Sequence, residues 1–195
     1  MARWMSCNDP QAARPEEAPV SIHWFSQTIG LGRGLDTLFQ ALDGLEGNWE
    51  LHLRGNLKGY EQWLEQACPT GVRERLKVHV LVENEELLSR IAEHDIGFAG
   101  ELAEPPSRNL TITNKFFQYL QAGLAVVASD TAGQREAVAQ VGGGALLFPN
   151  GEAPILRKLL QSLILNKTDL QEHRRMAWEP GERLCWEKEV MRLDA

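Results

Sequence analysis

The chain has 195 residues, of which 43% are hydrophobic and 24% charged, with a formal net charge of −7 and a sequence pI near 5.3. This acidic balance argues against a nucleic-acid partner, which requires a basic face. No apolar run approaches the roughly 18 residues of a membrane span, so we expect neither a span nor a secretory signal. The cysteines, Cys7, Cys68 and Cys185, fit neither a disulfide framework nor a zinc motif, which favours the cytoplasm.

The length predicts one compact domain, which we assign to residues 20–195. Residues 1–19 are polar, contain Pro10, Pro15 and Pro19, and show no periodicity. Such a segment is typical of a linker or a flexible tail.

Strand and helix patterns alternate along the rest of the chain. Asn84 is expected to cap a helix, because Asn is a preferred N-cap residue. His52 and His79 alternate with apolar neighbours and are expected to be packing or surface residues. In chain order we predict a strand over 20–25, a glycine-rich turn over 26–34, a helix over 34–45, a strand over 49–54 that ends at Gly55, a helix over about 59–67, a strand over 76–81, a helix from residue 84 and a strand over 95–99.

Residues 111–130, TITNKFFQYLQAGLAVVASD, predict a short helix, a glycine stop and a buried strand. Thr113 and Asn114 are N-cap residue types, so the helix should begin within one or two residues of Asn114. Gly123 ends it, and residues 124–128 suit a strand covered on both sides. After it we expect a helix near 135–140, a sixth strand over 145–148 and further helices. Three large apolar residues share the core-facing stripe of the short helix: Phe116, Tyr119 and Leu120.

The start of this helix is a candidate binding site. Lys115 and Gln118 are three residues apart and share another face, beside the open N-terminal turn. A helix N-terminus carries unpaired N–H groups and a partial positive charge, so a lysine there fits a phosphate site. An ordinary helix–strand unit with a solvated lysine fits the spacing equally well.

Six alternating strands and helices predict an α/β fold, a Rossmann-like, doubly wound parallel sheet with helices on both faces. Right-handed crossovers favour the strand order 3-2-1-4-5-6. Ligands in such folds bind at the carboxyl ends of the strands, near the switch between strands one and four. We therefore expect the turn over 26–34 and the helix start at 111–115 to converge on one site.

A nicotinamide dinucleotide site fits poorly. The turn contains Gly30, Gly32 and Gly34, but Leu35 replaces the third glycine of G-x-G-x-x-G. The second strand ends in Arg54, where an NAD site needs an acidic residue for the ribose. No D-x-D motif or His/Cys cluster indicates a metal site either.

The segment over 114–130, NKFFQYLQAGLAVVASD, resembles the donor-binding half of GT-B glycosyltransferases, and the retaining family 4 enzymes most of all. In that family the helix start holds the donor diphosphate, and an acidic side chain reaches the ribose. Gln118 occupies the acidic position here, and Leu110, eight residues earlier, stands where a second Glu is common. The pair formed by Arg33 and Gly34 matches the family's basic residue and glycine, whose basic side chain clamps the diphosphate through charged hydrogen bonds. The C-terminal CWEKEV, with Trp186, resembles the family's tail.

The resemblance implies one half of a GT-B hexosyltransferase, with a nucleoside-diphosphate sugar as substrate and neither a metal nor another cofactor. An acceptor-binding domain, N-terminal or on a separate chain, would complete it. Two alternatives stay open: a sugar-nucleotide epimerase relative, or a non-catalytic domain that binds a nucleotide sugar or a partner protein. No catalytic residue is assigned. The residues expected to bind the donor are Thr28, Arg33, Gly34, Gly55, Thr113, Asn114, Lys115 and Gln118.

Overall fold

The computed structural model describes residue 15 and residues 17–181. Most of the expected tail and the C-terminal segment with Trp186 lie outside the described residues. The described chain forms a six-stranded, all-parallel sheet in the order β3-β2-β1-β4-β5-β6, which confirms the predicted fold and strand order. The strands are β1 (Val20–Thr28), β2 (Trp49–Asn56), β3 (Leu76–His79), β4 (Ile96–Ala99), β5 (Ala125–Ser129) and β6 (Ala145–Phe148).

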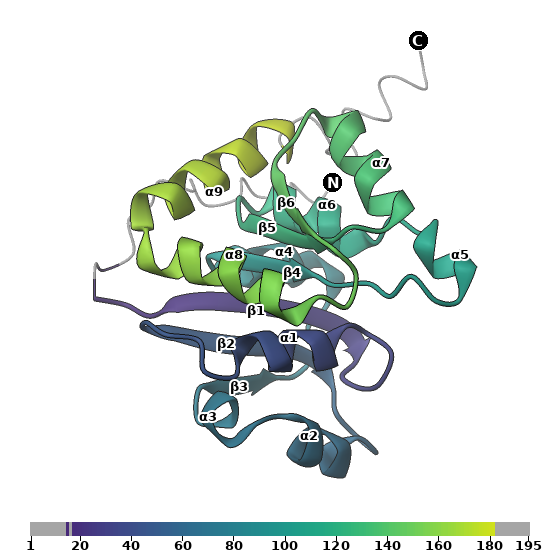
Figure 1. Cartoon of the computed structure of the whole chain (residues 1–195), viewed down its shortest axis with the longest axis vertical. Coiled ribbons are helices and arrows are strands. Elements are labelled where there is room, and N and C mark those ends of the chain that lie inside the picture. Colours follow the sequence, from purple (N-terminus) through teal and green to yellow (C-terminus); the bar gives the residue numbers. More distant parts are fainter. Residues whose placement is uncertain (1–14, 16, 182–195) are drawn as a thin grey trace.

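Helices cover both faces of the sheet (Figure 1). One core lies between the sheet and α1 with α8, and a second lies on the other face under α4 and α6. No helix in the described part of the chain is long and apolar enough to cross a membrane. The helices are α1 (Leu35–Leu42), α2 (Glu61–Ala67), α3 (Thr70–Arg73), α4 (Asn84–Ile91), α5 (Pro106–Asn109), α6 (Asn114–Gln121), α7 (Ala132–Val141), α8 (Ala153–Leu165) and α9 (Lys167–Gly181).

The predicted boundaries differ from the structure where the first strands end. β1 and β2 both run further than expected, so Gly55 lies inside β2 rather than after it. A Cβ atom on Gly55 would lie 2.5 Å from the Ser26 carbonyl oxygen, so the two strand ends approach this closely only because residue 55 is glycine. The cap of α4 is Glu83, whose carbonyl accepts the first helical hydrogen bonds, and Asn84 is the first helical residue. The expectation that Asn84 is the cap was therefore wrong by one residue.

Helix α6 is fixed to the sheet by Tyr119. Its ring is fully buried, and its hydroxyl donates a hydrogen bond to the carbonyl oxygen of His23 on β1, at 3.0 Å. The ring lies over Gly97 of β4, where any Cβ atom would overlap it. A Tyr hydroxyl needs such a partner when buried, so this contact sets both the position and the rotation of α6 above β1 and β4.

The face of the sheet that carries α4 is polar over β1, β2 and β3. Four histidines form a stacked group there, which we call the histidine cluster: His23, His52, His79 and His94. The rings of His23 and His94 stack at 4.4 Å between centroids, and Nδ1 of His52 lies 2.9 Å from Nε2 of His79. Burial lowers the pKa of His23 well below its usual value, and the nearby Arg54 guanidinium lowers it further. Burial lowers the pKa of His52 to about 4, and that of His79 is lowered for the same reason.

These pKa values predict that the free energy of unfolding decreases as the pH falls from about 6.5 towards 4. In that range the unfolded chain binds more protons on these histidines than the folded chain, whose histidine pKa values are lowered, so protonation favours unfolding. Each histidine that stays neutral contributes a slope of up to about 1.4 kcal/mol per pH unit. Urea unfolding at pH 7, 6 and 5 measures the slope.

A variant comparison separates the histidines from the carboxylates, which also titrate at acidic pH. His52→Gln should flatten the decrease between pH 6.5 and 4.5. His173→Gln, on α9 and outside the histidine cluster, is the control and should keep the parent slope. Equal slopes for His52→Gln and the parent would contradict the assignment of the pH dependence to this cluster.

Candidate functional site

A pocket of about 560 Å³ opens at the carboxyl ends of β1 and β2, between the starts of α4 and α6. At these strand ends the chain leaves β1 towards β2 and leaves β4 towards β5, which lie on opposite sides of the β1–β4 pair. Ligands of doubly wound folds bind at this position. We call it the strand-end pocket. Its lining residues are Phe25, Ser26, Gln27, Thr28, Arg54, Asn56, Leu81, Val82, Asn84, Leu87, Asn114 and Gln118.

The strand-end pocket combines an apolar side with a polar rim. Leu81, Val82 and Leu87 come from the β3–α4 connection and from α4, and together they offer an apolar surface. Amides and hydroxyls line most of the rest, together with Phe25 and Arg54, and none of the lining residues is Asp or Glu. An apolar slot with a few polar groups is the usual form of a small-molecule site.

Three of the eight predicted residues line this pocket: Thr28 at the end of β1, and Asn114 and Gln118 on α6. The first residues of the predicted turn, 26–28, therefore meet Asn114 in one pocket, whereas Arg33, Gly34 and Lys115 do not line it. Gln118 precedes the anchoring Tyr119, so it points away from the core stripe and towards the strand ends. Thr113 is the N-cap of α6 as expected, but its side chain makes no capping hydrogen bond.

Gly55 does not line the pocket and serves the close approach of β1 and β2. Gly34 has a left-handed backbone, and a Cβ atom there would lie 2.7 Å from the Gly100 carbonyl oxygen. A glycine is therefore needed for the start of α1 to lie against the end of β4. Arg33, in the same turn, is exposed and lies outside the lining of the strand-end pocket.

Lys115 is buried rather than solvated at the helix start. Its Nζ lies 2.8 Å from Oε1 of Glu101, and the two side chains are only 10% and 11% exposed. Glu101 follows β4, and its backbone is held by Ser129, which both donates to and accepts from it, and by Asn150. The sequence did not indicate this ion pair, because Glu101 lies 14 residues away in a loop without periodicity.

Arg54 is a further residue of the pocket that the sequence had not assigned to donor binding. Its side chain is 5% exposed, and its Nη1 donates to the carbonyl oxygen of Val80 at 2.9 Å. Its Nε is buried without a hydrogen-bond partner, and no carboxylate in the described chain forms an ion pair with it. Burial lowers its pKa. The position of Arg54 at the end of a central strand is the feature of the sequence that could have indicated a binding role. In the sequence, that position argued only against an NAD site.

The connection from β4 to α6 contributes another cation. Arg108, in α5, donates a hydrogen bond to the carbonyl oxygen of Gly32 and so ties this connection to the glycine-rich turn. Leu110 follows α5 and is 71% exposed. The position where the family commonly has a second Glu therefore presents an apolar side chain to solvent.

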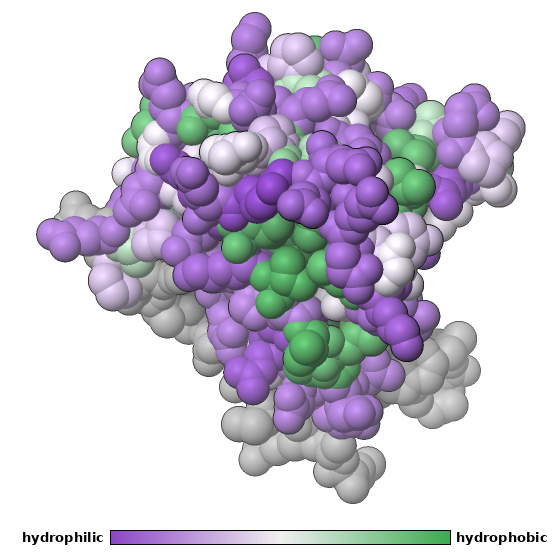
Figure 2. Space-filling view, turned by 90° about the horizontal axis from the view of Figure 1, so that it is seen from below, coloured by the Kyte–Doolittle hydropathy of each residue, from purple (hydrophilic) through white to green (hydrophobic). Residues whose placement is uncertain are grey.

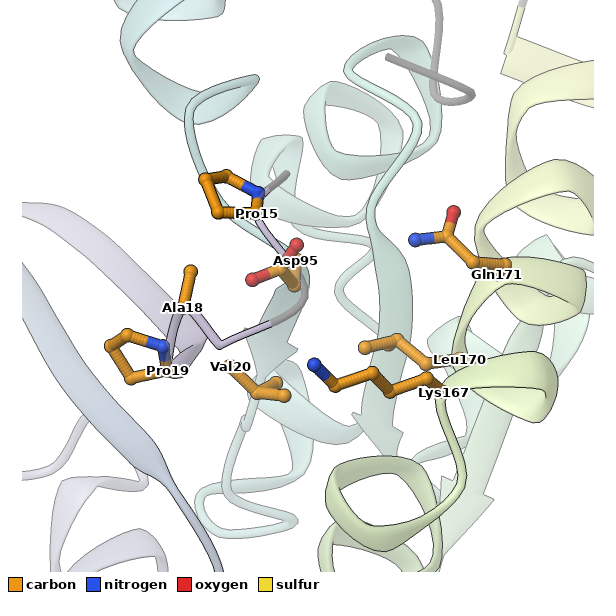
Figure 3. A pocket seen from close by; sticks show the side chains of 8 residues that line it. All are labelled: Pro15, Ala18, Pro19, Val20, Asp95, Lys167, Leu170 and Gln171. Carbon is orange, nitrogen blue, oxygen red and sulfur yellow. The ribbon is translucent and has the colours of Figure 1, made fainter. Parts of the chain in front are cut away.

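A second, smaller pocket, of about 170 Å³, lies at the opposite edge of the sheet, beside Asp95 (Figure 3). Figure 3 shows Lys167, Leu170 and Gln171 on one side of it, facing the chain before β1 on the other. One oxygen of Asp95 accepts hydrogen bonds from Ser21, and the other lies 3.4 Å from Nη1 of Arg174. These contacts indicate a structural role for Asp95.

Apolar side chains are also exposed along the edge strand β3 and just after it, at Val78, Val80 and Leu81. Figure 2 views the side of the molecule on which β3, α2 and α3 lie in Figure 1, and apolar atoms gather there in the middle of a mainly hydrophilic surface. Leu81 belongs both to this exposed group and to the lining of the strand-end pocket.

Solved structures share this architecture. The catalytic domain of cholesterol-alpha-glucosyltransferase from Helicobacter pylori aligns with a TM-score of 0.66 and 13% identity, over 86% of this chain and 100% of that one. The C-terminal domain of a group 1 glycosyl transferase, LpcC, from Francisella tularensis aligns with a TM-score of 0.62 and 14% identity, over 86% and 88%. HepE from Anabaena, solved in complex with UDP-glucose, aligns with a TM-score of 0.69 and 20% identity, over 86% of this chain but 44% of HepE.

At these identities the alignments establish a common fold, and this chain spans less than half the length of HepE. Comparison with curated protein sequences gives no match. The family model described as glycosyl transferases group 1 matches residues 26–166, which include the glycine-rich turn, α6 and every residue of the strand-end pocket except Phe25. The chain therefore belongs to the group 1 glycosyl transferases and has the fold of their GT-B donor-binding domain.

Proposed function

We propose that this chain binds a nucleoside-diphosphate sugar in the strand-end pocket and is the donor half of a hexosyltransferase. The observation that carries the proposal is the meeting of Thr28, from the end of β1, with Asn114 and Gln118, from the start of α6, in one pocket. Family membership and the UDP-glucose complex of the Anabaena protein support the same ligand class.

The proposed orientation follows from the charges around the pocket. Arg33 is an exposed cation in the glycine-rich turn, which suits it to a diphosphate that approaches from solvent. Lys115 adds positive charge at the start of α6, where the helix dipole also favours an anion. Its ion pair with Glu101 keeps the lysine in a fixed place and leaves the outer phosphate contacts to Arg33. Gln118 would then reach the ribose.

We propose that transfer requires an acceptor-binding domain, N-terminal or on a separate chain, because positioning of the two reactants supplies much of the rate in such reactions. Neutralisation of the leaving diphosphate would come from protein cations, without a divalent metal. The scattered cysteines support a cytoplasmic location.

One observation favours a second candidate, a domain that binds the nucleotide sugar without catalysis. Gln118 and the exposed Leu110 occupy positions where the family commonly has acidic residues. Both acidic charges are therefore missing from these positions.

Nucleoside diphosphates are expected to raise the melting temperature of the purified chain, because a ligand that binds only the folded state stabilises it. Thermal shifts with UDP, GDP and ADP, each with and without EDTA, test this. The shift should survive EDTA. A chain that responds to none of the three, or whose response disappears with EDTA, would contradict the proposed ligand or its independence of metal.

Gln118→Glu is expected to tighten nucleoside diphosphate binding by roughly 0.5–1.5 kcal/mol, since an ionised acceptor makes the stronger bond to ribose hydroxyls. The opposing term is repulsion from the diphosphate, which Arg33 and Lys115 would screen. Calorimetry measures the difference. Gln62→Glu, an equal change of charge at an exposed position of α2, is the control and should bind like the parent. Unchanged or weaker binding by Gln118→Glu would mean that residue 118 does not contact the ribose.

A further inference from the structure

Arg54 presents a buried cation to the strand-end pocket and forms no ion pair within the described residues, although the Glu93 carboxylate lies near enough to favour its charged form. Among the described residues, Nη1 donates to the Val80 carbonyl oxygen, whereas the buried Nε has no hydrogen-bond partner. Burial of a charge without an ionic partner costs several kcal/mol of stability. A neutral, apolar side chain would fill the same space without that cost, so the guanidinium calls for a function.

The bond to Val80 places Arg54 at one end of the strand-end pocket. Val80 lies in the connection from β3 to α4, directly before the apolar residues Leu81 and Val82. The start of α6, with Asn114, forms another wall of the same pocket. If the diphosphate lies at the glycine-rich turn and α6, as proposed above, the nucleobase lies against Leu81 and Val82, within reach of Arg54.

The chemistry of a guanidinium restricts which base it can read. Arginine has five N–H donors and no acceptor, so it pairs with carbonyl oxygens and unprotonated ring nitrogens. Uracil offers two carbonyl oxygens and a single N–H donor, for which an amide oxygen such as that of Asn84 is sufficient. Adenine has ring-nitrogen acceptors but no carbonyl oxygen, and its amino group is a donor like the guanidinium itself. Guanine offers a guanidinium its O6 and N7 acceptors, but its N1–H and amino donors then require two further acceptors, and the lining holds no carboxylate to supply both.

We propose that Arg54 donates a hydrogen bond to a ring carbonyl of the nucleobase and makes the pocket selective for uracil over guanine and adenine. This inference rests on the proposed function, because it assumes that a nucleotide occupies the strand-end pocket. It adds a specificity residue and a named base to that function.

Calorimetry on the full chain with UDP, GDP, ADP and inorganic pyrophosphate tests the proposal, with the variants Arg54→Met and Arg54→Lys. The parent should bind UDP at least ten times more tightly than ADP. Arg54→Met should weaken UDP binding about 10- to 100-fold, the scale of one charged hydrogen bond, and leave ADP and pyrophosphate within a factor of two. Arg54→Lys keeps the charge without the planar guanidinium, and its affinity for UDP should lie between those of the parent and of Arg54→Met. Arg175→Met, at an exposed position of α9, is the control and should bind like the parent.

The outcomes separate the two levels of the argument. A parent that binds none of the three nucleotides would overturn the proposed function, and the role of Arg54 with it. A parent that binds all three alike would leave the function standing and overturn the selectivity. If Arg54→Met weakens UDP, ADP and pyrophosphate equally, Arg54 is a phosphate ligand or a support for the Val80 loop, and the proposal fails. If Arg54→Met does not fold, Arg54→Lys decides: an unchanged ratio of UDP to ADP affinity overturns the proposal.

Discussion

The position of α6 depends most on the packing of Tyr119 against β1 and β4. Its hydroxyl bonds to the His23 carbonyl, and its ring fits only because residue 97 is glycine. These contacts hold α6 over β1 and β4, the two strands between which the strand order reverses. They therefore also set the direction in which the neighbouring Gln118 points. A larger residue at position 97 would push α6 off the sheet and open the wall of the strand-end pocket that carries Asn114 and Gln118.

Close backbone contacts assemble the rest of the site. Gly34 lets the start of α1 lie against Gly100, and Gly55 lets the end of β2 approach the Ser26 carbonyl. The Lys115–Glu101 pair then joins α6 to the loop after β4. Movement of α6 away from this loop would separate the two buried charges, which is unfavourable because each would lose its partner. These contacts hold the elements that line the pocket, and the β3–α4 connection adds its apolar surface.

The sequence was sufficient for the fold and for part of the site. Periodicity located all six strands, and the N-cap residues placed the start of α6 at Asn114, because these signals are local. It could not pair Lys115 with Glu101, or show that Arg54 is buried beside Val80, because such contacts depend on how loops pack in three dimensions. Gly55 was expected after the end of the second strand and among the donor-binding residues, whereas β2 continues beyond it. The histidine cluster has no signal in the sequence either, because its four members lie far apart in the chain and meet only on the folded sheet.

The strand-end pocket places its apolar slot beside α4 and its polar groups on β1 and α6, which suits a nucleotide with its base towards β3 and its phosphates towards the glycine-rich turn. Backbone amide chemical shifts, recorded as UDP is added to the isotope-labelled chain, test this central claim most directly. The account predicts the largest changes around Gln27, Asn84 and Gln118, three residues that are far apart in sequence and meet only in this pocket. Changes confined to the pocket beside Asp95, or no changes at saturating UDP, would contradict it.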